Sequence, residues 1–258
     1  MEAVPIPYSQ RYKGVIETIV PAGVAERFFR RARKAGELST EPPSGWSTIS
    51  SGPENILAVF RPLKLKAGFM LTGYRFQEDG NGNGFVYAVP KETGVPEPEM
   101  CLIDQNSFLS PPVPPFALED VMDAMEGDGS PLSYFCASLL KRELSEFGAM
   151  WHGCSWSTHE LVTQDPFEPC GCLRAKSGDA ERLESREHVG NWKWLKSKPS
   201  RWEPRVKMAE DNVTVTFHTH TALEREGIYR HVDRYKAGTY RFKTHRIMIV
   251  EGQGGYIF

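Results

Sequence analysis

DNVTVTFHTH, residues 211–220, alternates apolar and polar side chains from Val213 to His218. In an extended chain Val213, Val215 and Phe217 share one face. The other face receives the polar residues Thr214, Thr216, His218 and His220. Two segments of similar character follow, residues 227–235 and 238–250, with a short turn between them. The carboxy-terminal part of the chain is therefore predicted to form an antiparallel β-meander.

The remaining segments predict strands and helices in mixed order. β-Branched and aromatic residues indicate four further strands: residues 12–20, 56–62, 68–76 and 85–89, the last two joined by a Gly- and Asn-rich loop at 79–84. Helical spacing of apolar residues indicates three helices: one after Pro21, a short acidic one over 118–126, and one from Ser130 to Gly148. The fold class expected is α+β, mainly antiparallel β-sheet and barrel-like, with two or three helices.

The length of 258 residues predicts a single α+β domain, residues 1–258. An alternative organisation has two β halves, about 1–110 and 150–258, bridged by the helices of 118–148. Seven prolines between Pro90 and Phe116 predict a surface connector. The apolar end of the chain, Tyr256 to Phe258, is expected to dock on a sheet.

Charge, apolar run length and cysteine content argue against several classes of protein. Lys and Arg number 31 against 33 Asp and Glu, a net charge of -2 that argues against a dedicated nucleic-acid coat protein. No apolar run approaches the roughly 20 residues of a membrane helix. Five scattered cysteines do not form a dense disulfide framework. A soluble, cytoplasmic protein without membrane contact is the expectation, and the oligomeric state stays open.

Residues 151–159, WHGCSWSTH, hold the densest group of reactive side chains. Cys154 near a histidine can act as a nucleophile or, with His159, as a zinc ligand, whereas packing in the core explains the same residues without chemistry. Cys170-Gly171-Cys172 would supply two more zinc ligands. Trp151 and His152 are candidate ligand-binding residues.

His218-Thr219-His220, with Glu224 four residues later, resembles the first metal-binding motif of the cupin family, His-x-His followed by Glu. The resemblance implies a divalent metal ion held by His218, His220 and Glu224, with His245 as a substitute fourth ligand. It covers these residues only, since His231 occupies the place of the family's glycine and no Pro-x-Gly turn precedes His245. A solvated polar face is the alternative.

A second polar face is predicted on the following strand, where Tyr229, His231, Asp233 and Tyr235 alternate. Asp233 would orient His231 for acid–base work, and the hydroxyls of Tyr229 and Tyr235 would bind a ligand. If antiparallel pairing places this face beside His218 and His220, these two histidines, His231 and Asp233 form a candidate catalytic group. A solvent-facing ladder of polar residues is the alternative.

A small-molecule-binding protein with a β-walled pocket is therefore the favoured function. An enzyme that uses His/Asp acid–base or metal-assisted chemistry is the favoured form of it, with the reaction class unassigned. The alternative is a non-catalytic module that binds single-stranded nucleic acid or a protein. Its basis is the stretch 191–207, in which three tryptophans alternate with six basic residues.

Overall fold

The computed structural model describes residues 14–37, 44–49, 52–101, 111–168 and 192–257. Its larger sheet has seven antiparallel strands in the order β1-β9-β10-β11-β12-β8, with β7 also paired to β10. These strands are β1 (Ile16–Ile19), β7 (Glu160–Val162), β8 (Lys193–Trp194), β9 (Arg205–Met208), β10 (Asn212–Thr221), β11 (Gly227–Lys236) and β12 (Phe242–Glu251). The predicted carboxy-terminal meander, β10 to β12, is confirmed.

A second sheet has the order β2-β4-β5, formed by β2 (Gly45–Ile49), β4 (Phe69–Glu78) and β5 (Asn81–Pro90). A small sheet pairs β3 (Leu63–Leu65) with β6 (Met125–Gly127). The α-helices are α2 (Ala22–Gly36), α3 (Pro53–Val59), α4 (Pro98–Cys101) and α5 (Pro131–Ser145). Short 3-10 turns are η1 (Lys91–Thr93), η2 (Val121–Ala124), η3 (Trp151–Gly153) and η4 (Trp156–Thr158).

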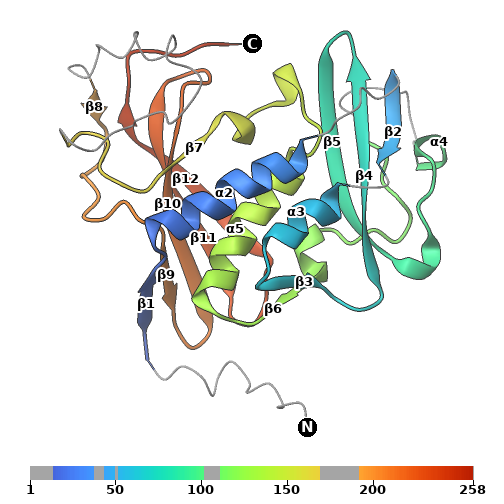
Figure 1. The fold of residues 1–258 in the computed structure, drawn as a ribbon, viewed down its shortest axis with the longest axis horizontal. Helices are drawn as coiled ribbons and strands as arrows, with labels where there is room; N and C mark the ends of the chain where they lie inside the picture. Colours follow the sequence, from blue (N-terminus) through green and yellow to red (C-terminus); the bar gives the residue numbers. More distant parts are fainter. Residues whose placement is uncertain (1–13, 38–43, 50–51, 102–110, 169–191, 258) are drawn as a thin grey trace.

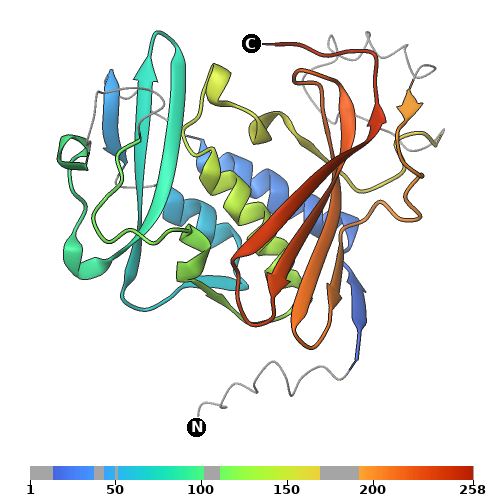
Figure 2. The same ribbon diagram turned by 180° about the vertical axis from the view of Figure 1, so that it is seen from behind.

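Helices α2, α3 and α5 lie between the two larger sheets, and the seven-stranded sheet curls around α2 and α5 (Figures 1 and 2). One cluster of buried apolar residues includes side chains from both sheets and from these helices. The predicted α+β, mainly antiparallel, curled-sheet fold is confirmed. The division into domains stays a prediction, and β1, from the start of the chain, pairs with β9 near its end. No helix in the described residues is long and apolar enough to cross a membrane.

Helix α5 is the centre of this arrangement. The Ser130 hydroxyl caps it by accepting from the Ser133 N–H at 3.2 Å, and Pro131 stands at its first position. Nearly every side of the helix is buried because sheets and helices surround it. Cys136 is fully buried there, so packing explains it, and burial raises the pKa of its thiol.

The curled sheet thus has two distinct faces. We call the face that packs against α5 the inner face, on which Phe217 meets Phe135 edge to face. The opposite face is the outer face. Residues paired directly across antiparallel strands share a face, so the register assigns each side chain to one or the other.

Three local predictions are wrong. Residues 56–62, predicted as a strand, instead contain the end of helix α3 at 56–59, because Pro53 opens a helix and a short apolar run does not distinguish the two. The helix predicted over 118–126 is a 3-10 turn, capped by Asp120, followed by β6. The 79–84 loop is only a two-residue turn, since Asp79 and Gly80 both have positive φ, 48° and 80°, and β5 begins directly after them.

The predicted surface connector and the predicted docking of the carboxy-terminal end also differ in part from the structure. Residues 91–93 and 98–101 form η1 and α4, and residues 102–110 lie outside the described part of the chain. Tyr256 is held through its backbone, whose N–H donates to Ala222 O at 2.9 Å. Ile257 is 83% exposed, so the expected burial of this side chain is wrong, and Phe258 lies outside the described residues.

At Gly84, strand β5 passes very close to the backbone of Phe147, just after the end of α5. A Cβ at Gly84 would lie 1.5 Å from the carbonyl oxygen of Phe147, which is backbone and cannot move aside cheaply. Gly84→Ala should therefore lower the free energy of unfolding by about 3 kcal/mol, at the upper end of overpacking costs.

Gly23→Ala, inside α2, is the matched control. Nothing lies within 4 Å of its added Cβ, and alanine favours the helix by up to about 1 kcal/mol. Urea unfolding of both variants measures the difference. Equal stability of the two variants would contradict the close approach at Gly84.

Candidate functional site

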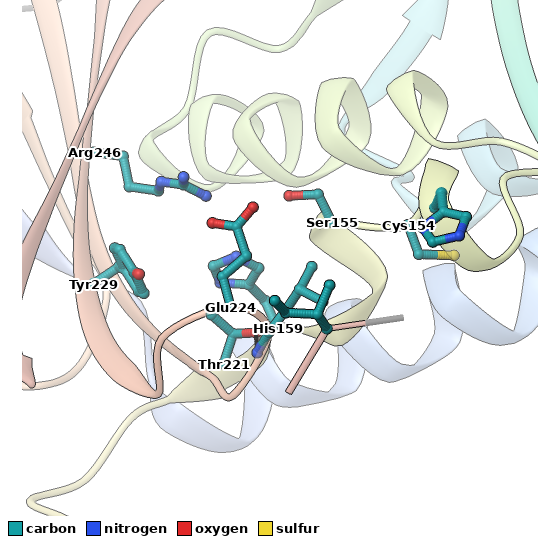
Figure 3. Close-up of a pocket in the computed structure, with 10 residues that line it drawn as sticks. Cys154, Ser155, His159, Thr221, Glu224, Tyr229 and Arg246 are labelled. Atoms are coloured by element: carbon teal, nitrogen blue, oxygen red, sulfur yellow. Dashed lines mark hydrogen bonds between the residues drawn. The ribbon is translucent and has the colours of Figure 1, made fainter. Parts of the chain in front are cut away.

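A pocket of about 250 Å³ opens where β10 turns into β11. Its lining comes from the 151–159 segment, the β10–β11 turn, the inner faces of β11 and β12, and the carboxy-terminal tail. The lining residues are His152, Cys154, Ser155, His159, Thr221, Leu223, Glu224, Tyr229, Arg246 and Ile257. In Figure 3, Tyr229 and Arg246 stand on one side, Cys154 and Ser155 on the other, and the Glu224 carboxylate between them.

A chain of hydrogen bonds runs inward from this pocket. His159 Nδ1 lies 2.7 Å from Thr219 Oγ1, which lies 2.8 Å from His231 Nε2. All three residues are buried, and the His231 ring stacks on Phe217. The hydroxyl has a single proton, so it donates to one imidazole and accepts an N–H from the other. The tautomers of the two histidines are therefore coupled through Thr219.

Both histidines are neutral at pH 7. Burial, and next the positive charge of Arg246, lower the pKa of His159 to about 3. Burial and the charge of Arg142 hold the pKa of His231 well below its ordinary value. The polar chain beneath the pocket thus carries no charge of its own.

Asp233, two positions along β11 from His231, is fully buried and paired. Its two carboxylate oxygens accept from the Arg142 guanidinium of α5 at 2.7 and 2.8 Å, a bidentate geometry. Arg142 also donates to Thr244 Oγ1 of β12 at 2.9 Å. Asp233 therefore anchors α5 to the sheet and makes no hydrogen bond to His231.

The 156–159 segment is held by both central helices. Glu143 of α5, which is buried, accepts from the Trp156 indole at 2.7 Å and from Arg33 of α2 at 3.2 Å. Arg33 also donates to the carbonyl oxygens of Trp156 at 2.6 Å and His159 at 3.0 Å. Burial raises the pKa of Glu143, and the adjacent Arg33 opposes that shift. These bonds fix where Ser155 and His159 meet the pocket.

Two charged residues, Arg246 and Glu224, line the pocket. The Arg246 guanidinium lies 5.0 Å from the centre of the Tyr229 ring, and no carboxylate of the described residues lies within 4 Å of it. Glu224 has a left-handed backbone with φ 59°, which residues other than glycine rarely adopt. Its N–H donates to Tyr256 O at 2.7 Å, so the tail holds this turn in place. Such a backbone conformation is enriched at functional sites.

The predicted meeting of four catalytic residues on one face is wrong. In the register, His231 pairs with Phe217, and Asp233 pairs with Val215, so both belong to the inner face. His218 pairs with Arg230 on the outer face, and His220 follows it there. The pleat separates the two pairs by the thickness of the sheet. Catalytic roles for the individual residues stay predictions.

The metal ligands predicted from the cupin-like motif do not fit a metal ion. His218 and His220 face outward, whereas Glu224 lines the pocket at the inner side. His220 Nε2 lies 3.4 Å from Glu226, and His245 is exposed on the outer face. Across the described ranges, no group of three or more His, Cys, Asp or Glu residues is placed to hold a metal ion.

Of the remaining predicted site residues, some line the pocket and others lie in the core or elsewhere. His152 and Tyr229 line the pocket, as predicted for ligand-binding residues, but Trp151 is not among its lining residues. Tyr235 is buried at the core and hydrogen bonds with Ser138 Oγ at 2.6 Å. Within the described chain no hydrogen bond joins Cys154 and His152 as a catalytic dyad. Cys170 and Cys172 lie outside the described residues.

Among the residues of the site that were not predicted from the sequence in these roles are Thr219, Arg246, Arg142 and Glu143. Thr219 occupies the apolar phase of the β10 alternation, which was the available signal. Arg246 is paired with His231 and therefore lies on the inner face, but this placement can be predicted only when the register of β11 and β12 is known. For Arg142 and Glu143 of α5, no local sequence pattern indicates a role at the site.

No known family, no curated protein and no solved structure matches the chain. The function is therefore inferred from its own residues, and the cupin resemblance stays confined to the short motif.

The hydroxyl of Thr219 offers a direct test of the buried chain. Thr219→Val keeps the shape of the side chain but leaves two buried imidazole nitrogens without a partner, so we expect a loss of about 2–3 kcal/mol in unfolding free energy. Thr219→Ser retains the hydroxyl and should lose less than about 1.5 kcal/mol. Urea unfolding compares them. A valine variant as stable as the serine variant would contradict the bridging role.

Buried neutral histidines predict a loss of stability in mild acid. Burial lowers the pKa of His218 to about 4, while the unfolded chain keeps the ordinary value of 6.5. As pH falls from 6.5 toward 4, only the unfolded state takes up the proton, so the folded state loses about 2 kcal/mol at pH 5 through this residue. His218→Gln should remove about that much of the loss measured between pH 7 and pH 5.

His245→Gln is the control, since His245 is exposed. This variant should keep the acid sensitivity of the unchanged protein. If both variants respond to pH alike, His218 does not contribute as described.

Proposed function

We propose that the protein binds a small molecule with an anionic group, a carboxylate or a phosphate, in the pocket beside Arg246. The observation that carries the proposal is a guanidinium that lines a pocket without a carboxylate of the described residues within 4 Å. Arginine presents paired N–H donors that match carboxylate and phosphate oxygens. An anionic ligand would supply the missing counter-charge.

The groups around Arg246 would orient the bound ligand. Burial raises the pKa of Tyr229, so its hydroxyl stays protonated and can donate to the same anion. Ser155 stands across the pocket from Arg246, and the Glu224 carboxylate between them would accept from a hydroxyl or amino group of the ligand (Figure 3). The volume of about 250 Å³ lies just below the usual range of ligand pockets and suits a compact metabolite.

Binding is better supported than acid–base catalysis. A base whose pKa is about 3 has little tendency to take a proton at pH 7, so His159 is poorly matched to that role. Neutral His159 is instead suited to hydrogen bonding. Cys154, without a histidine partner in the described chain, is not arranged as an activated nucleophile.

Thermal unfolding with a panel of small anions tests the proposal. The probes are amino acids, hydroxy-carboxylates and sugar phosphates, each at millimolar concentration. A probe present at one hundred times its Kd stabilises the folded state by about 2.7 kcal/mol, which raises Tm by about 5 °C or more for a chain of this size.

The variant Arg246→Gln should abolish the shift, and Arg234→Gln should retain it because Arg234 is exposed on the outer face of the neighbouring strand. The proposal is contradicted if no anion raises Tm, or if Arg246→Gln responds as the unchanged protein does.

A further inference from the structure

The outer face of the curled sheet is strongly basic, although the whole chain has a net charge of -2. Its outward positions on four adjacent strands, β9 to β12, contain six Lys or Arg residues and no acid. These positions are Arg205, Lys207, Asn212, Thr214, Thr216, His218, His220, Ile228, Arg230, Val232, Arg234, Lys236, Lys243, His245, Ile247 and Val250. The pairing Arg234↔Lys243 places two of the cations directly side by side.

These cations are largely unpaired within the fold. Lys207, Arg230, Arg234 and Lys243 have no carboxylate within 4 Å among the described residues. Arg205 has one at 3.7 Å, Glu17 of β1, which is also the only acid on the adjoining edge strand. Like charges placed together repel one another, so a face of this kind is stabilised by an anionic partner.

Aromatic side chains cover the other end of the same face. Trp194 of β8 pairs with Val250 there, and its ring lies 5.3 Å from that of Phe167. Trp202 packs on His218 at 5.2 Å between ring centres. Trp194 is 38% exposed, and Lys193 and Lys196 beside it are exposed as well. An accessible indole thus adjoins the basic positions.

We propose that this outer face binds single-stranded nucleic acid. Cations on a sheet hold the phosphates, and an exposed indole stacks with a base, which is the combination used by proteins that bind single strands. The site is distinct from the pocket, which opens at the inner side, and does not depend on the function proposed for it.

A duplex fits this surface less well. Neighbouring strands are about 4.8 Å apart, so the backbones of β9 and β12 are separated by about 14 Å before side chains are counted. The major groove of B-form DNA is about 12 Å wide and admits a helix or a two-stranded ribbon. A flexible single strand can instead follow a curved sheet.

Fluorescence anisotropy with labelled oligo-uridine and oligo-thymidine of about 20 nucleotides tests the proposal, titrating the full chain at 50 and 200 mM salt. The variant K207E/R234E/K243E reverses three exposed outer-face cations. We expect at least a tenfold rise in Kd. The slope of log K against log salt should become shallower by about 2, because each phosphate that is no longer neutralised removes about 0.7 from the slope.

The matched control is R27E/R31E/K34E, which makes the same change in net charge on the exposed side of α2. It should bind within twofold of the unchanged protein. Trp194→Ala should weaken binding several-fold while leaving the salt slope unchanged, because stacking does not release counterions. Thermal unfolding of each variant verifies that it is folded.

Three results would overturn the proposal. The first is no binding of either oligonucleotide at 50 mM salt. The second is an equal loss of affinity in the α2 control, which would indicate attraction to overall charge. The third is binding to vesicles of phosphatidylserine and phosphatidylcholine without binding to oligonucleotides, which would assign the face to an anionic membrane surface.

Discussion

The buried carboxylate of Glu143 is the contact on which the pocket depends. It joins Arg33 of α2 at 3.2 Å and the Trp156 indole at 2.7 Å, so three separate parts of the chain meet at one group. A buried charge without a partner costs several kcal/mol, whereas a paired one with further hydrogen bonds is tolerated. The two helices and the 156–159 segment must therefore dock together. The position of His159 at the pocket follows from that docking.

The pleat of the sheet is the second constraint. A period of two assigns neighbouring residues to opposite faces, so Arg230 and His231 serve different surfaces although they are adjacent in sequence. On the inner face, contact with α5 buries polar groups, which then require partners such as the Arg142–Asp233 pair. On the outer face, much of the surface meets solvent and cations are tolerated there without partners in the described chain.

Sequence patterns were sufficient for the meander, for α2 and α5, and for the fold class, because each depends on local periodicity. They failed for the meeting of His218 and His220 with His231 and Asp233, because the register and the buried face are set by tertiary packing. The β10 alternation breaks at His218, after which both His218 and Thr219 are buried. Burial on both faces erases the period that a half-exposed strand shows, and α5 and Trp202 cause it from outside the strand.

Electrostatics keeps the two faces chemically different. Burial and nearby guanidinium groups hold His159 and His231 neutral, so the charges at the pocket are those of Arg246 and Glu224. The single guanidinium of the pocket suits the small anion proposed as its ligand, whereas six outer-face cations suit the extended polyanion proposed there. Each strand contributes to both surfaces through alternate residues. A substitution at one position of β11 therefore alters one surface and leaves the other intact, so the two proposed binding sites can be tested separately.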